Sequence, residues 1–114
     1  MSEACLFCKI ITGEIPATIV DRTETTVAFR DIAPVSPTHV LVVPIRHVAT
    51  LGEAVDVDPT LAADVIAHCA RIARLEGLAE GYRVVINTGW HGGQEVHHLH
   101  AHVLGGRRHA WPPG

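Results

Sequence analysis

The sequence predicts an α+β domain, a five-stranded antiparallel sheet with two helices. Apolar residues recur at helical spacing in two segments, and five short runs are apolar and partly β-branched, as is typical of strands. The connections that follow the first helix are short, which favours antiparallel neighbours because parallel strands need long crossovers. The 114 residues are enough for one domain with its own core, so residues 1–114 are expected to form a single domain.

The N-terminal half is predicted to contain a short helix and three strands. An apolar stripe at i, i+1, i+4 and i+5 spacing predicts the helix, and Gly13 is placed to end it. Residues 18–22 and 26–30 are short β-like runs joined by a polar turn. Residues 39–44 are almost entirely apolar, which predicts a buried strand. The stripe of the helix consists of Leu6, Phe7, Ile10 and Ile11.

The C-terminal half is predicted to contain a long helix and two strands. Asp58 and Pro59 are typical of an N-cap and a first helical residue, and Gly77 is typical of a helix end. Between them, apolar residues repeat at helical spacing. Residues 82–87 and 96–104 are predicted strands, and the loop between them, residues 88–95, holds three glycines.

The composition excludes several classes of protein. A hydrophobic content of 47% and a net charge of −3 exclude a disordered chain. The charge leaves no basic surface for nucleic acid, and no apolar run approaches the roughly 20 residues of a membrane span, so neither partner is expected. The N-terminus lacks a secretory pattern, which predicts a cytoplasmic protein. Because there are nine histidines and a single lysine, we expect histidines, amides and backbone N–H groups to bind any anion.

The segment around residue 100 carries a row of histidines. On a strand, alternation places His98, His100 and His102 on one face and an apolar row on the other. Same-face neighbours lie about 6.6–7 Å apart, so two of the three could share a metal but all three could not readily do so. The alternative is a polar face turned to solvent. A row of imidazoles otherwise offers a nucleophile, a proton donor and an anion binder near neutral pH.

This row resembles the signature of the histidine triad (HIT) nucleotide hydrolases and transferases. The segment His98-Leu99-His100-Ala101-His102-Val103-Leu104 matches their His-φ-His-φ-His-φ-φ pattern. The resemblance covers nearly the whole chain and includes Pro37-Thr38-His39, Gly92-Gly93-Gln94 and Val103-Leu104-Gly105-Gly106. The terminal Trp111-Pro-Pro-Gly114 is similar to that of the Hint branch, the purine nucleoside phosphoramidases.

The resemblance implies a nucleotidyl-histidine mechanism. His100 would be the nucleophile that attacks the α-phosphorus of a purine nucleoside 5′-phosphoramidate, and water would then release the nucleoside monophosphate. His102 would donate to the phosphate oxygens. The family requires no magnesium, so none is expected here. His39 would lie near the phosphate, although a hydrogen-bonded core histidine is an equal alternative.

The resemblance also implies a site for a purine nucleotide such as AMP. Asp31 would accept hydrogen bonds from the ribose hydroxyls. Glu95 stands where the Hint branch has a serine, which puts the rate and the preferred leaving group in doubt. Trp111 would reach across a homodimer that joins two sheets into ten continuous strands. The base would lie against Phe7, Ile10, Phe29 and Ile32, and the phosphate would lie near Asn87, Gly93, Gln94 and Val96.

The motif Cys5-x-x-Cys8 is weak evidence when taken alone. A redox pair, two half-buried small residues and a metal site all fit it, although no strand precedes it as in thioredoxin-like proteins. Bacterial-type HIT proteins of this pattern bind zinc, and the resemblance implies a structural zinc in a Cys₂His₂ set. Cys69 falls on the apolar stripe of the long helix and is expected in the core. The implied zinc ligands are Cys5, Cys8, His47 and His98.

Three other functions remain open at this point. A nucleotide sensor with slow or no turnover is favoured by Glu95 alone. A dinucleoside polyphosphate hydrolase of another HIT branch is disfavoured by the C-terminal tail. A purely structural zinc module would leave His100, His102 and Gln94 unexplained.

Overall fold

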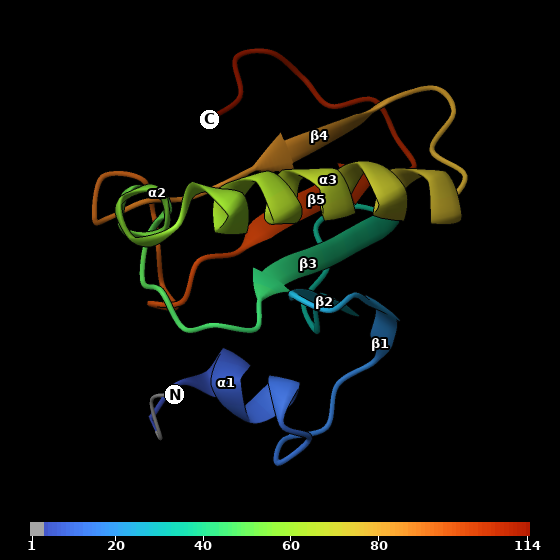
Figure 1. Cartoon of the computed structure of the whole chain (residues 1–114). Coiled ribbons are helices and arrows are strands. Elements are labelled where there is room, and N and C mark those ends of the chain that lie inside the picture. Colours follow the sequence, from blue (N-terminus) through green and yellow to red (C-terminus); the bar gives the residue numbers. More distant parts are fainter. Residues whose placement is uncertain (1–3) are drawn as a thin grey trace.

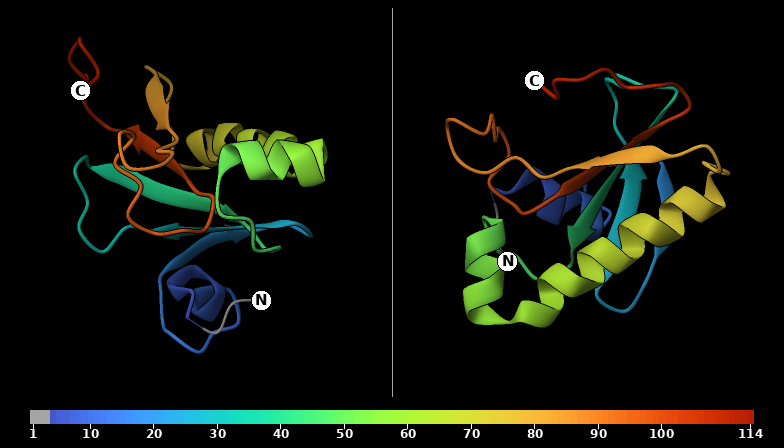
Figure 2. Two further views of the ribbon diagram at one scale, coloured as in Figure 1. Left: turned by 90° about the vertical axis from the view of Figure 1, so that its left-hand side faces the viewer. Right: turned by 90° about the horizontal axis from the view of Figure 1, so that it is seen from above.

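The computed structural model describes residues 4–114 and shows a five-stranded antiparallel sheet with helices on both faces (Figures 1 and 2). The spatial order of the strands is β1-β2-β3-β5-β4, so β1 and β4 form the two edges. Among residues 4–114, no helix combines the length and apolar character that a bilayer span requires. The elements are α1 (Leu6–Ile11), β1 (Ile19–Arg22), β2 (Thr26–Arg30), β3 (Thr38–Pro44), α2 (Leu51–Val57), α3 (Pro59–Leu75), β4 (Tyr82–Val85) and β5 (Ala101–Gly105).

The sheet separates two apolar clusters. Successive side chains of β3 alternate, so Val40 and Val42 contribute to the cluster beneath α3, whereas Leu41 and Val43 contribute to the cluster beneath α1. All four of these side chains are buried. A central strand buried on both faces explains why residues 39–44 are nearly continuous in apolar character.

The long helix begins and ends as its sequence predicts. The Asp58 carboxylate accepts a hydrogen bond from the Thr60 backbone N–H at 3.0 Å, and Pro59 is the first helical residue. Gly77 adopts a φ of 69° just beyond the helix, a conformation that other residues rarely adopt.

The prediction of two helices is wrong, because α2 is a third. Its N-terminus is capped by Thr50, whose hydroxyl accepts from the Glu53 backbone N–H at 3.1 Å, while the Glu53 carboxylate accepts from Ala49 N–H at 3.1 Å. This exchange closely resembles a capping box, which the Thr-x-x-Glu spacing could have indicated. The helix has only seven residues, of which Ala54 alone is buried, so its apolar periodicity is weak.

The last predicted strand, residues 96–104, is also wrong in its first half. The ladder between β3 and β5 runs from Thr38 paired with Gly105 to Val42 paired with Ala101. Continued in the same register, it would bring Leu99 opposite Pro44, which has no N–H to donate. The Leu99 N–H instead donates to the Val48 carbonyl at 2.8 Å. The strand predicted over residues 82–87 likewise ends earlier, at Val85.

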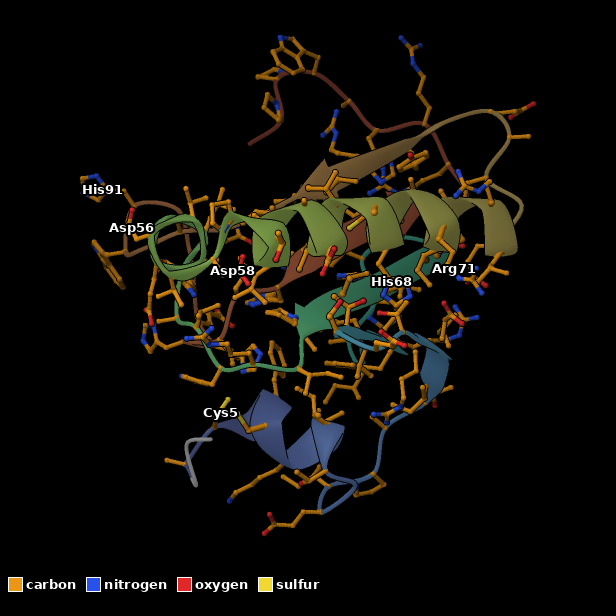
Figure 3. All side chains as sticks on the ribbon, in the orientation of Figure 1. Cys5, Asp56, Asp58, His68, Arg71 and His91 are labelled. Atoms are coloured by element: carbon orange, nitrogen blue, oxygen red, sulfur yellow. The ribbon has the colours of Figure 1, made fainter. Side chains whose placement is uncertain are left out.

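A buried hydrogen-bond chain ties α3 to the β1–β2 hairpin (Figure 3). The carboxylate of Asp21 accepts from His68 Nε2–H at 2.8 Å and from Arg71 Nε–H at 2.7 Å. The Nδ1 atom of His68 can therefore accept from the Thr26 hydroxyl at 2.7 Å. The hydrogen bond from Arg71 is the main cause that lowers the pKa of Asp21.

We expect His68→Leu to destabilise the protein by about 1–3 kcal/mol, because it leaves the buried Thr26 hydroxyl without its imidazole partner. Urea unfolding would measure the change in the free energy of unfolding. His91→Leu is the matched control, since His91 is exposed. Equal destabilisation by the two variants would show that the hydrogen bonds of His68 contribute nothing to the stability of the fold.

Candidate functional site

Three histidine rings gather where β3 and β5 lie side by side. His39 is on β3, His102 is on β5, and His100 immediately precedes β5. The ring centroids of His39 and His102 are 5.2 Å apart, and those of His100 and His102 are 5.1 Å apart. The Leu99, Ala101 and Val103 side chains point to the opposite face and belong to the cluster beneath α3, so the predicted alternation is confirmed around these positions.

The ring of His100 is held in one tautomer by its own segment. Its Nδ1 lies 2.7 Å from the carbonyl oxygen of His98, which can only accept, so Nδ1 carries the proton. The Nε2 atom therefore has a free lone pair. Burial is the main cause that lowers the pKa of His100, so the ring is neutral at neutral pH. A neutral imidazole with a fixed proton on the far nitrogen is suited to nucleophilic attack.

The tautomers of His39 and His102 follow from one backbone N–H. Val35 N–H donates to His39 Nδ1 at 3.1 Å, so His39 carries its proton on Nε2. That proton points to His102 Nδ1 at 2.9 Å, whereas the Asp31 carboxylate is farther away, at 3.4 Å. His102 consequently keeps its own proton on Nε2. Burial, with smaller contributions from His100 and His39, lowers the pKa of His102 to about 4.

The same argument weighs against a metal ion among Asp31, His39 and His102. One potential ligand atom from each of these residues lies within 4.8 Å of the others. A metal would need the lone pair of His39 Nε2, but the Val35 N–H already occupies the other nitrogen, so Nε2 holds the proton. Histidine ligands instead normally donate their second nitrogen to an acceptor.

A different cluster, made of Cys5, Cys8, His47 and His98, could hold a metal. The Nδ1 atoms of the two histidines are 3.1 Å apart, and Cys5 Sγ lies 3.3 Å from His98 Nδ1. Cys8 Sγ lies 3.4 Å from His47 Nδ1 and 3.6 Å from His98 Nδ1. In a tetrahedral zinc site the known bond lengths place ligand atoms roughly 3.3–3.8 Å apart, which these separations approach.

The second nitrogen of His98 supports its role as a ligand. His98 Nε2 lies 2.8 Å from the carbonyl oxygen of Pro44, so this nitrogen donates and the Nδ1 lone pair faces the cysteines. The cluster joins α1 to the segments that follow β3 and precede β5. Cys69 lies apart from it, buried in the cluster beneath α3 as predicted, and burial raises the pKa of its thiol to about 11.

The loop over residues 88–95 needs glycine for its own backbone. A Cβ at Gly92 would lie 2.3 Å from the Thr88 carbonyl oxygen, and Gly93 has a φ of 75°. The Gln94 side chain spans the loop, because its Oε1 accepts from Gly89 N–H at 3.1 Å and its Nε2 donates to the carbonyls of Ala49 and Val96, at 2.7 and 3.1 Å. The structure therefore gives Gln94 a role in holding the loop.

Asn87 and Asp31 each keep part of their hydrogen-bonding capacity. The Asn87 amide donates one hydrogen to the Gly92 carbonyl at 2.7 Å and has a second hydrogen. One Asp31 oxygen accepts from Ala33 N–H at 2.7 Å, and the other faces His39. Both residues can still bind a ligand.

The remaining predicted binding residues differ in exposure. Ile32 and Trp111 are 98% and 83% exposed, and Glu95 is exposed as well. Val96 is half-buried and packs against the cluster beneath α1. Their contacts with a nucleotide stay predictions. Three apolar members of the expected base slot are buried in that same cluster, namely Phe7, Ile10 and Phe29.

Sequence reasoning could not identify which backbone groups fix the rings. The carbonyls of His98 and Pro44 and the N–H of Val35 set the protonated nitrogens of His100, His98 and His39. No residue type signals such a role, because every residue except proline carries both groups. Pro44 was the only residue type that could have indicated such a group, since a proline at a strand end has no N–H to donate to the neighbouring strand.

Comparisons with known proteins find relatives along nearly the whole chain. The model of the HIT domain family matches residues 12–109, a range that contains His47 and His98 but not the two N-terminal cysteines. A purine nucleoside phosphoramidase from Escherichia coli K12 is 45% identical over 108 residues, 94% of this chain and 91% of the relative.

Two solved structures share the fold. A HIT family hydrolase from Legionella pneumophila Philadelphia 1 has a TM-score of 0.92 and 50% identity, and the match covers 96% of this chain and 99% of that one. A zinc-bound histidine triad family protein from Mycobacterium smegmatis has a TM-score of 0.84 and 33% identity, with coverage of 97% and 80%.

Proposed function

Because the chain belongs to the HIT domain family, we propose that it hydrolyses the P–N bond of purine nucleoside 5′-phosphoramidates. The observation that carries the proposal is the free Nε2 of His100 on a ring whose Nδ1–H is held by the His98 carbonyl at 2.7 Å. The name of the relative from Escherichia coli, a purine nucleoside phosphoramidase, supports this choice of substrate.

In the first step, His100 Nε2 attacks the α-phosphorus and the P–N bond breaks. The bond electrons leave with the amine, which takes up a proton from solvent, and the nucleotide remains on His100. The ring then carries a positive charge, which the His98 carbonyl stabilises by accepting the Nδ1–H hydrogen bond. In the second step, water attacks phosphorus and gives up a proton to solvent, and His100 leaves as neutral imidazole while the nucleoside monophosphate forms.

The phosphate oxygens would be held by fixed donors of the protein. The hydrogen bonds through His39 leave the proton of His102 on Nε2, from which it can be donated. Asn87 has a second amide hydrogen to donate. Such donors are already oriented before charge develops in the transition state. We therefore expect turnover without magnesium.

The nucleoside contacts and the dimer complete the proposal. Asp31 would bind the ribose hydroxyls, and the base would lie near Ile32. The strand β4 is an unpaired edge whose Tyr82 and Val84 side chains are exposed, which suits pairing with β4 of a second copy into a ten-stranded sheet. The exposed Trp111 would then contact the partner.

We further propose that the Cys5, Cys8, His47 and His98 cluster holds a structural zinc ion. The two sulfur and two nitrogen donors are a set that zinc prefers, and their separations of 3.1–3.6 Å approach those of a tetrahedral site. When bound, the ion would tie α1 to the segment that carries His98. The zinc-bound relative from Mycobacterium smegmatis supports this identity.

Release of AMP from adenosine 5′-phosphoramidate, without added magnesium, tests the proposed reaction. We expect rapid release that added magnesium leaves unchanged. Guanosine 5′-phosphoramidate in a parallel assay would define the purine preference. Faster cleavage of diadenosine tetraphosphate than of the phosphoramidates would contradict the proposal and favour a dinucleoside polyphosphate hydrolase.

A slow nucleotide sensor is the second candidate, and the environment of Glu95 favours it. This exposed carboxylate makes no hydrogen bond or ion pair with any of residues 4–114, so its charge is not neutralised near the loop. A carboxylate repels a phosphate group. Tight AMP binding with no AMP release from the phosphoramidate would support the sensor.

A further inference from the structure

The loop before β3, residues 32–37, supplies the backbone N–H that fixes two of the active-site tautomers. Val35 N–H donates to His39 Nδ1 at 3.1 Å, and the protonated His39 Nε2 points to His102 Nδ1 at 2.9 Å. The loop has little support from its own backbone. It contains two prolines, which have no N–H, and none of its backbone groups pairs with the backbone of another described residue. Side chains from elsewhere must therefore hold Val35 in place.

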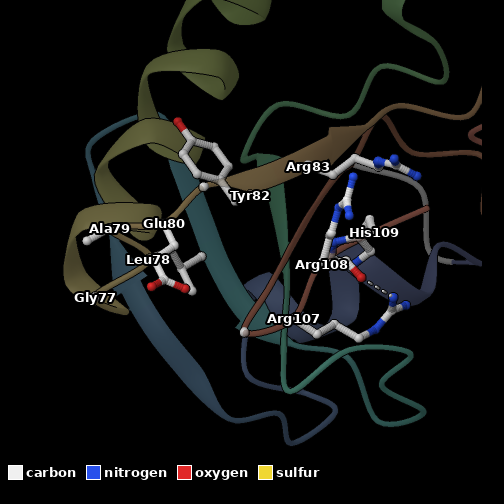
Figure 4. Close-up of a pocket in the computed structure, with 11 residues that line it drawn as sticks. Gly77, Leu78, Ala79, Glu80, Tyr82, Arg83, Arg107, Arg108 and His109 are labelled. Atoms are coloured by element: carbon white, nitrogen blue, oxygen red, sulfur yellow. Dashed lines mark hydrogen bonds between the residues drawn. The ribbon is translucent and has the colours of Figure 1, made fainter. Parts of the chain in front are cut away.

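Two side chains of the segment that follows β5 make these contacts, and Figure 4 shows both of them on that segment. The Arg107 guanidinium group donates to the Val35 carbonyl at 3.1 Å. His109 Nε2 is hydrogen-bonded to the Ser36 hydroxyl at 2.7 Å, and Ser36 is the one buried residue of the loop. Val35 is therefore held on both sides, since its carbonyl binds Arg107 and its N–H binds His39.

The segment that follows β5 is itself anchored. Gly106 has a φ of 87°, and a Cβ there would lie 2.7 Å from Pro37 Cβ, so the backbone passes close to the loop. Farther along, Arg83 of β4 donates to the Ala110 carbonyl at 2.7 Å. The two side chains that hold the loop therefore extend from a fixed backbone. All of these contacts are made within one chain and need no open surface, so they do not conflict with pairing of β4 with a second copy.

We propose that Arg107 and His109 are positioning residues of the candidate active site. By fixing the loop, they keep Val35 N–H on His39 Nδ1, and they thereby keep the proton of His102 on Nε2. The consequence for catalysis rests on the proposed function, in which that proton is donated to the phosphate of the substrate.

Release of the loop would allow the two imidazoles to exchange tautomers. Without the Val35 N–H, His39 Nδ1 can carry the proton, and His39 Nε2 then accepts from His102 Nδ1–H. His102 Nε2 would present a lone pair, which repels phosphate oxygens, instead of a proton that binds them. The Asp31 carboxylate favours the original tautomer, but it lies 3.4 Å from His39 Nε2, farther than His102 Nδ1 at 2.9 Å. We therefore expect exchange between the two tautomers rather than complete conversion.

The ring ¹⁵N signals of the full chain, labelled with ¹⁵N-histidine, test the proposal, because the shift of each ring nitrogen reports whether it carries a proton. For wild-type His39 we expect an unprotonated Nδ1 and a protonated Nε2. In the double variant Arg107→Met with His109→Leu, the two signals should move toward each other. Ser36→Ala removes the other partner of His109 and should shift them in the same direction. This readout needs neither substrate nor turnover.

The double variant should also release AMP from adenosine 5′-phosphoramidate with a kcat/KM about three- to tenfold below that of the wild type, because part of the molecules lack one phosphate donor. His109→Gln should restore the ring signals and the rate when it replaces His109→Leu, since a glutamine amide can hydrogen-bond the Ser36 hydroxyl. Arg108→Gln is the matched control. Arg108 lies in the same segment, and its exposed side chain makes no hydrogen bond or ion pair with the described residues.

Three results would overturn the proposal. The first is unchanged His39 ring signals in the double variant, even if the rate falls, because the segment would then act through the fold alone. The second is an equal shift in Arg108→Gln. The third is the same shift in His109→Gln as in His109→Leu. Absence of turnover in a wild type that shows the expected ring signals would contradict the proposed function and still support the positioning of His39 by this segment.

Discussion

His100→Ala is expected to reduce AMP release from adenosine 5′-phosphoramidate by about a thousandfold or more, as is usual when a nucleophile is removed. In the proposed mechanism the wild-type Nε2 is the reacting atom, and the rest of the ring contributes through the Nδ1–H bond to the His98 carbonyl at 2.7 Å. Alanine removes both. Because His102 and Asn87 remain, the variant should still bind AMP, so kcat should fall far more than affinity.

His97→Ala is the matched control for this experiment. His97 is an exposed histidine in the same segment and lies outside the candidate active site. Its replacement should leave kcat within about threefold of the wild type, since exposed substitutions away from a site have small effects. Quenching in denaturant at alkaline pH with labelled substrate should trap a nucleotidyl-protein in the wild type and in His97→Ala only, because a phosphorus–nitrogen bond to histidine is hydrolysed in acid. Retention of a tenth or more of the activity by His100→Ala would rule out His100 as the nucleophile.

The sequence predicts which side chains lie together better than it predicts the elements that carry them. Side-chain alternation predicts that Leu99 and Ala101 lie in the core. Both are buried there, although only Ala101 is paired with β3. The strand itself was overextended, because alternation says which face a residue occupies but not whether its backbone has a partner. Pro44 has no N–H with which to continue the pairing of β3 with β5, and which residue it affects depends on the register of these two strands.

The tautomers could not be predicted from sequence. They depend on carbonyl and N–H groups at Pro44, His98 and Val35, whose positions follow from the folded backbone. The metal cluster shows the opposite case, because its four residue types carry the chemistry themselves. The sequence predicted that grouping, and the structure brings the four side chains together.

Cys8→Ser is expected to abolish the proposed zinc binding and to lower the Tm by on the order of 10 °C. A ligand that binds only the native state stabilises it by about 4 kcal/mol when its free concentration is a thousand times the Kd, and a few kcal/mol shift the Tm of a domain of this size by roughly that amount. Zinc content per chain and thermal unfolding would be measured on the same samples. A chelator should lower the Tm of the wild type and leave that of Cys8→Ser unchanged.

Cys69→Ala is the matched control, because Cys69 is also buried but belongs to the cluster beneath α3. It should keep the full zinc content and cost about 1 kcal/mol, as a small core truncation does. The comparison of Cys8→Ser with Cys69→Ala matters because His98 belongs to the metal-binding cluster and also contacts His100 of the candidate active site. His98 offers Nδ1 to the cluster, donates from Nε2 to Pro44, and holds His100 through its carbonyl. If wild-type protein contains no zinc and Cys8→Ser unfolds no earlier than Cys69→Ala, hydrogen bonds alone must hold His98 in place.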